Sequence, residues 1–526
     1  MAHTPLLQTL RQLATDARAS AASGLDVEQV VERRSAAGWS RRQFLGKSAL
    51  GAAALASAPW LRAAKASGPG ARVVVVGAGL AGLTCALRLK EAGIDATIYE
   101  ANTRVGGRCW TRRGDFAEAQ IAEHGGELID QGHTAIRQLA QQLRLPLDNL
   151  LAAEPNGSEP FFYFDGSRYG YAEATADLKG IWQKIHRDLT DAGYPTLYYR
   201  STARGRELDR MSIAEWIDAT VPGGRQAKLG QLLDVGYNIE YGAEVERQSA
   251  LSLLYLLGYN SPGQFNLFGA SNEKYHVRGG NDRIVSTLVS VLGGQIVPGT
   301  ALVAAVRTAS GAYSLTLQNG RRTFEVTADK VVFALPFSIL RTAVDFSRAG
   351  FSPLKQTAIR ELAMGTNSKL NVQFSRRHWV GLGGNGDSFS DAGYQATWEV
   401  SRGQPGTAGI LVGYSGGDHA NTFGRGSVAT QTSQFLAQLE PVFPGSGANF
   451  NGRATLDFWP GDVFTRGSYA YWQPGQYTRF AGVEGAQEGN AHFCGEHTSI
   501  DSQGYLNGAV ETGERAAAEI SADLGL

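Results

Sequence analysis

The sequence predicts an α/β fold in which a parallel sheet is covered by helices. Two observations lead to this prediction. Residues 72–76 form a short β-branched run, which is typical of a strand buried on both faces. A glycine-rich turn, a helical stretch through Leu89 and a second strand over residues 96–99 follow directly. Strand, helix and strand in this order predict two parallel strands joined by a helical crossover.

Length and composition set limits on the rest of the molecule. The 526 residues, 43% of them apolar, are enough for a large core, and at about 150 residues per domain they predict two to four domains. Lys plus Arg equals Asp plus Glu at 49 each, which excludes a broadly basic nucleic-acid-binding protein and an acidic disordered chain. Three cysteines cannot form a disulfide framework, and neither they nor the nine scattered histidines suggest a metal site.

The N-terminal region resembles a twin-arginine export signal. Arg41-Arg42 is followed by Phe44-Leu45, a mildly apolar stretch over residues 48–61 and the small-x-small sequence Ala64-Lys65-Ala66. About 14 apolar residues are too few to span a membrane, which takes roughly 18–20. We therefore expect residues 1–66 to be a signal region, the protein to be periplasmic or secreted, and the twin-arginine machinery to be a partner. The alternative is a short amphipathic helix with a chance arginine pair, and no later segment is a transmembrane candidate.

The turn after the first strand predicts a dinucleotide site. In Gly-Ala-Gly-Leu-Ala-Gly, Gly77 permits the tight turn, Gly79 lets the backbone approach a pyrophosphate, and Gly82 allows close packing of helix on strand. The helix N-terminus offers free N–H groups to phosphate. Glu100, 18 residues beyond Gly82, is placed to accept ribose hydroxyls. The candidate residues are Gly77, Gly79, Leu80, Ala81, Gly82, Glu100 and Ala101.

Two downstream segments indicate FAD rather than NAD. Residues 104–108, Arg-Val-Gly-Gly-Arg, resemble the second flavin signature of the glutathione-reductase-like flavoproteins, which implies that Arg108 meets the pyrophosphate. An ordinary turn is the alternative. Residues 123–130 resemble the segment that passes the flavin ring in the flavin amine oxidases. The resemblance implies flavin contacts from Gly126, Glu127 and Leu128.

A C-terminal segment resembles the flavin motif of the same family. Cys494-Gly495-Glu496-His497-Thr498 is followed by a run over residues 504–513. A helix starting near Tyr505 would direct its positive end at the flavin N1–C2=O edge, which gains negative charge on reduction. The residues implied to contact FAD here are Gly495, Glu496, Gly504, Tyr505, Leu506 and Ala509. Further upstream, Val303 and Trp459 are implied as additional contacts.

The resemblance to the flavin-containing amine oxidases (monoamine, polyamine and L-amino-acid oxidases) covers nearly everything after residue 70. It implies a Rossmann-like FAD-binding domain of the glutathione-reductase type, interleaved with a substrate-binding domain that holds a mixed β-sheet and helices, one of them over residues 211–219. We expect residues 70–145, 270–349 and 462–526 to form the former, and residues 146–269 and 350–461 to form the latter.

Three residues are the catalytic candidates. Lys369 lies in a strand-like run over residues 365–374 and resembles the family lysine that holds a water against flavin N5; its charge would also stabilise superoxide. Tyr469 and Tyr505 match the pair of rings that face each other across the flavin. A solvated lysine and ordinary buried tyrosines are the alternatives. Monoamine oxidases have a flavin-linked cysteine where this chain has Ser468, so we expect non-covalent FAD.

The predicted reaction is hydride transfer from the α-carbon of an amine to flavin N5. Oxygen is then reduced to hydrogen peroxide, and water hydrolyses the imine to a carbonyl compound and ammonia or an amine. We prefer an amine oxidase, and the alternative is an L-amino-acid oxidase, whose substrates could include basic amino acids. The reason is that Leu128 stands where venom-type L-amino-acid oxidases have an arginine for the substrate carboxylate. Arg247 and Arg278 are possible replacements. The acids Glu127 and Asp130 could attract the second ammonium group of a diamine, a polyamine or a basic amino acid. The alternative is that both are solvated loop charges.

Other classes are set apart by specific features. A relative of the carotenoid desaturases or porphyrinogen oxidases should lack Lys369 and the paired tyrosines. A NAD-dependent dehydrogenase would not need the C-terminal motif, and an inactive FAD-binding scaffold would not be reduced by amines. The oligomeric state is left open, with a homodimer as the candidate.

Overall fold

The computed structural model of the protein describes residues 70–258 and 271–526. The chain divides into two units, residues 1–70 and residues 71–526, and the features reported below lie in the second. The export signal predicted for residues 1–66 falls outside the described residues. Among the described helices, none is both long enough and apolar enough to cross a membrane.

A five-stranded parallel sheet contains the two predicted strands. The four valines of its central strand β1 are all buried. Val73 and Val75 share a core with helical residues such as Leu83 and Ile284, whereas Val74 and Val76 share a second core with strand residues such as Leu302 and Leu315. The predicted α/β fold is therefore confirmed. In spatial order the strands are β21 (Ala491–Phe493), β13 (Lys330–Phe333), β1 (Val73–Val76), β2 (Ala96–Tyr99) and β9 (Ile296–Val297).

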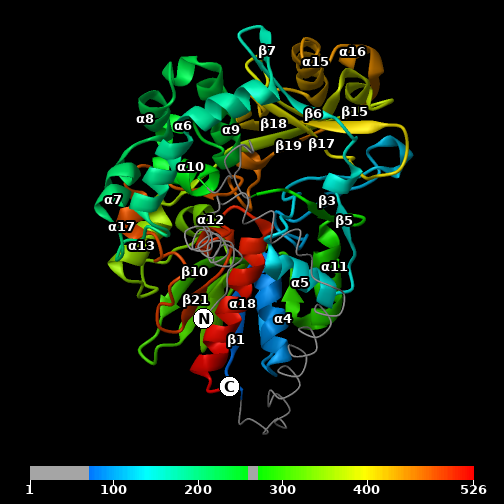
Figure 1. The fold of residues 1–526 in the computed structure, drawn as a ribbon. Coiled ribbons are helices and arrows are strands. Elements are labelled where there is room, and N and C mark those ends of the chain that lie inside the picture. The colour runs from blue at the N-terminus through cyan, green and yellow to red at the C-terminus, as the bar shows by residue number, and fades with distance from the viewer. Residues whose placement is uncertain (1–69, 259–270) are drawn as a thin grey trace, which may run out of the picture. The chain divides into compact units, whose positions relative to one another are not determined.

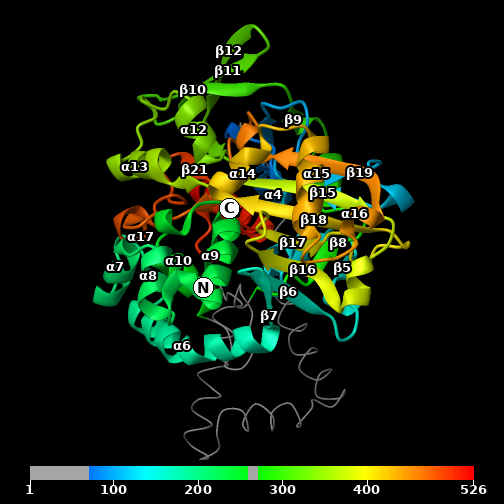
Figure 2. The same ribbon diagram turned by 90° about the horizontal axis from the view of Figure 1, so that it is seen from above.

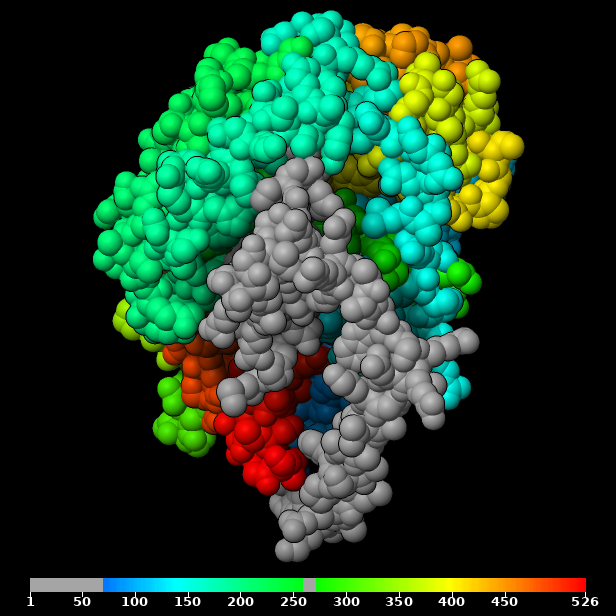
Figure 3. Space-filling model, viewed as in Figure 1, coloured from blue at the N-terminus to red at the C-terminus, as the bar shows by residue number. Residues whose placement is uncertain are grey.

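Two helices from opposite ends of the described chain pack together beside this sheet (Figure 1). They are α4 (Leu80–Glu91), which follows β1, and α18 (Leu506–Asp523), the last of the described helices. Their backbones approach closely at Gly513, where a Cβ would lie 2.4 Å from the carbonyl oxygen of Ala81. In the space-filling view the red surface of α18 lies beside the blue surface of the first described segment (Figure 3). The neighbouring helices are α5 (Thr134–Gln142) and α11 (Asp282–Leu292).

A three-stranded antiparallel meander precedes β13. It contains Val303, and the helix that follows residues 278–280 is α11. The strands are β10 (Ala301–Arg307), β11 (Tyr313–Asn319) and β12 (Arg322–Ala328), and the helices near them are α12 (Phe337–Ala343), α13 (Pro353–Glu361) and α17 (Gln476–Phe480).

The largest sheet of the described residues is mixed and has seven strands. Only β6 and β16 pair in parallel, and all its other neighbours are antiparallel. This sheet and the helices beside it confirm the mixed architecture expected for the substrate side. In spatial order the strands are β19 (Phe450–Phe458), β15 (Asn367–Phe374), β18 (Gly409–Gly416), β17 (Ala396–Glu399), β16 (Gly384–Ser390), β6 (Glu159–Phe164) and β7 (Ser167–Tyr169).

Helices gather beside the seven-stranded sheet, and α9 packs directly on β16, β17 and β18 (Figure 2). The helix predicted over residues 211–219 is α8, which begins with a capping box formed by Ser212 and Glu215. These helices are α6 (Tyr171–Ala192), α7 (Ala203–Arg210), α8 (Ile213–Thr220), α9 (Lys228–Tyr241), α10 (Ala250–Leu257), α14 (Gly417–Phe423), α15 (Val428–Leu439) and α16 (Ser446–Asn449).

Short strand pairs join the distant segments. They are β3 (Thr111–Arg112) with β4 (Ala122–Glu123), β5 (Leu147–Asn149) with β8 (Tyr275–Val277), and β14 (Ala363–Met364) with β20 (Ala470–Tyr471). The strands of the five-stranded sheet all come from the segments predicted for the FAD-binding domain, and those of the seven-stranded sheet from the other segments. The domain boundaries themselves stay a prediction.

Candidate functional site

The turn after β1 has the geometry that its glycines predict. Gly77 has a φ of +105°, and a Cβ there would lie 2.6 Å from the carbonyl oxygen of Ala334. A Cβ at Gly82 would lie 2.0 Å from the carbonyl oxygen of Gly77. At Gly79, by contrast, a Cβ would meet no atom of the protein within 4 Å. The turn thus needs Gly77 and Gly82 for its own packing, whereas Gly79 faces open space.

The N-terminus of α4 lies at this open space. Gly79 is its N-cap, no side chain caps this end, and the first turn contains no acidic residue. The N–H groups of Leu80, Ala81 and Gly82 precede the first intrahelical bond, from Leu83 N to Gly79 O at 3.0 Å. Free N–H groups and a positive helix end favour a phosphate at this position.

Glu100 directly follows β2 and lies beside this turn. Its Oε2 accepts a hydrogen bond from the Ala78 N–H at 2.7 Å, and its Oε1 accepts one from the Asn102 N–H at 2.8 Å. Burial raises the pKa of this carboxyl, and the two N–H donors act against the rise. Each oxygen keeps a lone pair for a further donor, such as a ribose hydroxyl. Ala101 follows directly and is half-buried.

Arg108 and Glu496 connect three segments that are far apart in the chain. Arg108 Nη1 donates to Glu496 Oε1 at 2.9 Å and to the carbonyl oxygen of Ser468 at 2.5 Å. Glu496 Oε2 accepts from the Gly504 N–H at 2.9 Å, and the Gly495 N–H donates to a threonine of α18. Within the described residues the remaining N–H groups of Arg108 have no hydrogen-bond partner, so they are available to an anion.

The C-terminal helix starts where the sequence predicts. Tyr505 is the N-cap of α18, without a side-chain cap and without an acidic residue in the first turn. Its next residue, Leu506, packs against the segment 123–130, because a Cβ at Gly126 would lie 2.7 Å from Leu506 Cδ2. Ala509 is half-buried, and so is Leu128 on the facing segment. A second uncapped helix N-terminus thus lies beside the segment predicted to pass the flavin.

Lys369 is buried in an ion pair. Its ammonium lies 2.6 Å from Glu127 Oε2 and 3.3 Å from the carbonyl oxygen of Gly125. Glu127 Oε1 accepts a hydrogen bond from Trp398 Nε1 at 3.0 Å, and the Lys369 ammonium lies 5.7 Å from the Trp398 ring centroid. Lys369 is 3% exposed and Glu127 is 8% exposed. Neither residue is a solvated charge, so that alternative is wrong for both.

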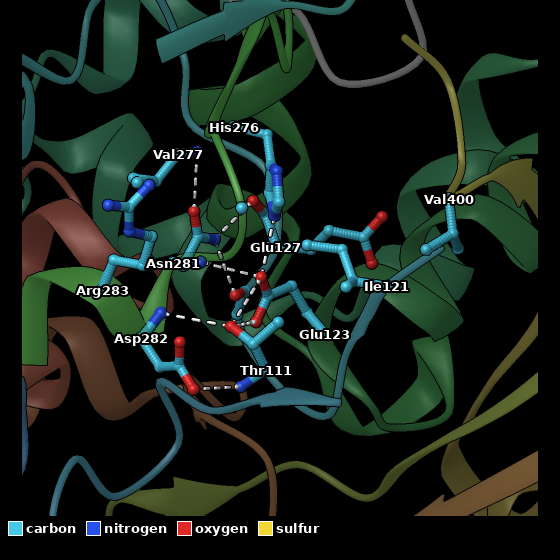
Figure 4. A network of polar contacts seen from close by, with 12 residues as sticks. Thr111, Ile121, Glu123, Glu127, His276, Val277, Asn281, Asp282, Arg283 and Val400 are labelled. Carbon is cyan, nitrogen blue, oxygen red and sulfur yellow. Dashed lines mark hydrogen bonds and ion pairs between the residues drawn. The ribbon is translucent and has the colours of Figure 1, made fainter. Parts of the chain in front are cut away.

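A buried polar network fixes the segment that carries Glu127 (Figure 4). Glu123 accepts hydrogen bonds from Thr111 Oγ1 at 2.9 Å and from the Asn281 N–H at 2.9 Å, and His276 Nε2 lies 2.8 Å away. Burial lowers the pKa of His276, but the hydrogen bond and charge of Glu123 outweigh it, so the pKa is raised. This carboxylate therefore connects β3, β4 and the start of α11.

Asn281 connects this network to the backbone of the segment that pairs with Lys369. Its Nδ2 donates to the carbonyl oxygens of Gly126 at 3.1 Å and Glu127 at 2.8 Å. Sequence reasoning did not single out Asn281. It directly follows the sequence Arg278-Gly279-Gly280, and this pair of glycines before a helix is the signal that could have found it.

Tyr469 and Tyr505 come together at the C-terminal end of α9. The Tyr469 hydroxyl donates to the carbonyl oxygen of Ile239 at 2.9 Å, and the Tyr505 hydroxyl donates to Glu240 Oε1 at 3.0 Å. Both rings are half-buried, and burial raises the pKa of each hydroxyl. Adjacent residues of one helix thus hold the hydroxyls of both candidate tyrosines.

Glu240 is a site residue that sequence reasoning missed. Burial raises the pKa of Glu240 to about 8; the hydrogen bond from Tyr505 acts against this rise, and the charge of Asp130 adds to it. A glutamate inside the run Tyr237-Asn238-Ile239-Glu240-Tyr241 interrupts a buried helix face, which is the only signal in the sequence.

The other charged candidates are engaged by other partners. Arg247 is 60% exposed and lies 3.8 Å from Asp418, and Arg278 is 64% exposed and pairs with an aspartate at 2.7 Å. Asp130 is buried, and its Oδ1 accepts from Ser271 Oγ and from two backbone N–H groups of residues 272 and 273. Asp130 is therefore not a solvated loop charge.

Three remaining candidates make hydrogen bonds to other parts of the protein. Trp459 is buried, and its Nε1 donates to the carbonyl oxygen of His124 at 2.9 Å. Ser468 is buried, and its hydroxyl donates to Asn367 Oδ1 at 2.5 Å. Val303 lies in β10 and is half-buried; its carbonyl oxygen accepts a hydrogen bond from the Asp345 N–H at 2.9 Å.

The residues present fit FAD. The open space at Gly79, the two uncapped helix ends and the unpaired N–H groups of Arg108 suit a pyrophosphate and an electron-rich ring edge, and Glu100 suits a ribose. Within residues 70–258 and 271–526, no group of three His, Cys, Asp or Glu side chains is placed to hold a metal ion.

Comparisons with known proteins agree with this reading. Residues 80–521 match the model of the family described as flavin containing amine oxidoreductase. YobN of Bacillus subtilis (strain 168), which carries the name of an L-amino-acid oxidase, is 26% identical over 480 residues, covering 85% of this chain and 94% of that protein. Nicotine dehydrogenase of Pseudomonas putida (strain DSM 28022 / S16) is 25% identical over 510 residues, covering 92% and 97%.

Solved structures agree with the fold. The structure of cyclohexylamine oxidase from Brevibacterium oxydans IH-35A covers 87% of this chain and is itself covered completely, with a TM-score of 0.75 and 20% identity. With the family match over most of the chain, the protein belongs to the flavin-containing amine oxidoreductases and is an FAD-dependent enzyme that acts on amines.

Proposed function

We propose that this protein oxidises an amine that lacks an α-carboxylate, by hydride transfer from the carbon next to nitrogen. Oxygen is reduced to hydrogen peroxide, and the imine is hydrolysed to an aldehyde and ammonia or a smaller amine. The observation that supports this proposal most is the joint placement of Tyr469 and Tyr505 at the end of α9, with their hydroxyls held by Ile239 and Glu240.

FAD, when bound, supplies the two-electron acceptor for this reaction. The chain binds it through the turn at Gly79, the N-terminus of α4 and Arg108. The rings of Tyr469 and Tyr505 orient the substrate, because aromatic faces attract a nitrogen that gains positive charge as its neighbouring carbon loses hydride. Their hydroxyls are engaged with α9, so the ring orientation is fixed in advance of binding.

Lys369 supplies a fixed charge, and no dedicated general base is required for the hydride step. The ammonium is held by Glu127 and by the carbonyl oxygen of Gly125, which fixes its position. A positive group stabilises the negative charge that forms on oxygen as it accepts an electron. The proposed role of Lys369 is therefore in the oxidation by O2.

The charges favour an amine over an α-amino acid. An α-carboxylate needs a cation, usually an arginine that makes two parallel hydrogen bonds. Arg247 and Arg278 are exposed and face aspartates, Arg108 is paired with Glu496, and Lys369 is paired with Glu127. L-Amino-acid oxidation is the second candidate, and the name of YobN favours it.

A peroxide-coupled screen tests the two candidates directly. Monoamines, diamines and polyamines are compared with the twenty L-amino acids on the purified enzyme. The proposal predicts peroxide with at least one amine at a kcat/KM well above that of any amino acid. Higher kcat/KM for L-amino acids would replace it with the second candidate.

We also propose that FAD is bound without a covalent bond and that the protein is exported by the twin-arginine pathway. Ser468 supports the first point, because a serine hydroxyl cannot form the thioether that a cysteine forms. The order of Arg41-Arg42, the apolar stretch and Ala64-Lys65-Ala66 supports the second. Lysines in place of both arginines should leave the protein in the cytoplasm with its residues 1–66 uncleaved, and continued export of this variant would overturn the proposal.

A further inference from the structure

We propose that Glu240 is a specificity-determining residue whose carboxylate binds a second, positively charged nitrogen of the substrate. The preferred substrates are then diamines or polyamines rather than simple monoamines. This inference rests on the proposed amine oxidation and adds the substrate class to it.

The position of Glu240 is the first argument. Its Oε1 accepts the Tyr505 hydroxyl at 3.0 Å, and the preceding residue, Ile239, accepts the Tyr469 hydroxyl at 2.9 Å. The Ile239 carbonyl oxygen also accepts Asn367 Nδ2 at 2.8 Å, so the end of α9 is tied to β15. The carboxyl group of Glu240 is therefore fixed beside the hydroxyl groups of Tyr469 and Tyr505. A substrate that carries a second amine beyond the reacting one could place that amine at this carboxyl group.

The helix end adds negative charge at the same place. α9 runs for 14 residues to Tyr241 and ends with Gly242 in the left-handed conformation. The C-terminal turn of a helix carries a partial negative charge from carbonyl groups without an intrahelical partner. Since Glu240 is the next-to-last residue of this helix, both charges favour a cation beside Tyr505.

Two other acids near the site, Glu127 and Asp130, are already engaged. Glu127 is bonded to Lys369 and Trp398, and Asp130 is bonded to Ser271 and to the backbone of residues 272 and 273. Glu240 receives a hydrogen bond on one oxygen only, and its Oε2 has no hydrogen-bond partner in the described part of the chain. Of these three carboxyl groups, Glu240 is the one left to meet a ligand.

Within residues 70–258 and 271–526, none of the groups that act on the pKa of Glu240 is a cation. The titratable groups that interact with its charge are the following tyrosines and acids from α9, β18 and the adjoining loops: Tyr237, Tyr241, Tyr414, Tyr469, Tyr505, Asp130 and Glu273. His133 packs on the Tyr505 ring at 4.9 Å, and burial lowers its pKa, which favours the neutral form. A substrate ammonium would therefore be the first positive charge beside this carboxyl group.

This environment gives substrate binding a pH signature. Because burial raises the pKa of Glu240 to about 8, the carboxyl is mostly protonated at pH 7 and ionises as the pH rises through 8. An ammonium beside it favours the ionised form. The kcat/KM for a diamine should therefore increase through pH 8, until the substrate amine itself loses its proton.

The test compares butane-1,4-diamine with butylamine on the FAD-loaded enzyme. Glu240→Gln keeps an acceptor for the Tyr505 hydroxyl but removes the charge. We expect it to lower the ratio of kcat/KM for the diamine to that for butylamine by about tenfold or more, and to abolish the rise of the diamine kcat/KM through pH 8. Glu240→Asp, which retains the charge, should keep part of the preference. Glu246→Gln removes an exposed charge paired with Arg225 and should leave the ratio as in the wild type.

The outcomes distinguish a failure of the role proposed for Glu240 from a failure of the proposed amine oxidation. If Glu240→Gln changes both substrates by the same factor and the pH profile is unaltered, Glu240 only holds Tyr505 and the inference is overturned. If wild-type enzyme oxidises L-amino acids and neither amine, the proposed function fails, and the role of Glu240 fails with it. A preserved diamine preference in Glu240→Gln would likewise overturn the inference while leaving amine oxidation intact.

Discussion

The Lys369 ammonium and the Glu127 carboxylate form a 2.6 Å ion pair inside the protein, although the two residues are 242 positions apart in the chain. Trp398 donates a hydrogen bond to the second oxygen of Glu127, so the pair is held from both sides. Breaking a buried pair by removing one partner leaves an uncompensated charge and destabilises a protein by about 3–5 kcal/mol. The stability of the protein and the proposed role of Lys369 in oxygen chemistry therefore depend on the same contact.

Lys369→Met should slow the reaction of the reduced enzyme with O2 by about tenfold or more, because the charge that stabilises superoxide is lost. FAD should remain bound. The measurement is the rate of flavin reoxidation after rapid mixing with oxygenated buffer. Unaltered oxygen kinetics would remove the role assigned to Lys369, and the double variant Lys369→Met, Glu127→Gln controls for the carboxylate left behind.

Glu127→Gln should lower the free energy of unfolding by about 3 kcal/mol in wild-type background but by much less in Lys369→Met background. The reason is that the cost arises from the unpaired partner. Urea denaturation of the four proteins of this double-mutant cycle measures the coupling. Equal losses in both backgrounds would show that the two side chains do not stabilise each other.

Asn281→Ala should weaken FAD binding about tenfold, because two carbonyl oxygens of the segment beside Lys369 lose their donor. Fluorescence titration of the apoprotein with FAD gives the dissociation constant. Asn490→Ala removes an asparagine whose Nδ2 donates to the carbonyl oxygen of Gly311, away from this segment, and is the matched control. An Asn281 variant that binds FAD as the control does would contradict this role.

Tyr469→Ala combined with Tyr505→Ala should reduce the rate of anaerobic flavin reduction by amine far more than the affinity for FAD. The rings are proposed to orient substrate, and the turn at Gly79 and Arg108 are proposed to hold the cofactor. Stopped-flow reduction and an FAD titration provide the two numbers. Equal losses in both would assign the tyrosines a structural role.

Denaturation should release all FAD into the supernatant, because Ser468 cannot form a thioether with the flavin. The chain is precipitated with acid, and absorbance and fluorescence are measured in pellet and supernatant. Flavin that stays with the polypeptide would refute the prediction of a non-covalent cofactor.

The sequence was most informative where the structure depends on local geometry. Gly77, Gly79 and Gly82 could be interpreted one by one because the turn they form is made by neighbouring residues, and Glu100 follows from the length of the helical crossover. The start of α18 at Tyr505 and the strand around Lys369 were also predictable from local patterns.

The contacts across the chain could not be predicted in this way. Glu127 and Asp130 are three residues apart and equally acidic, yet one pairs with Lys369 and the other with the backbone of residues 272 and 273. Glu240 and Asn281 acquire their roles only when α9 and α11 are packed against other segments. Charge and spacing identify candidates, but which acid meets which partner is decided by the tertiary fold.

Anaerobic titration of the purified enzyme with an amine tests the central claim most directly. The account predicts that a purified, yellow protein loses its flavin absorbance in proportion to the added amine, and that admitting oxygen restores the absorbance with formation of hydrogen peroxide. A fully loaded enzyme whose flavin stays oxidised in the presence of every amine and every L-amino acid would contradict it.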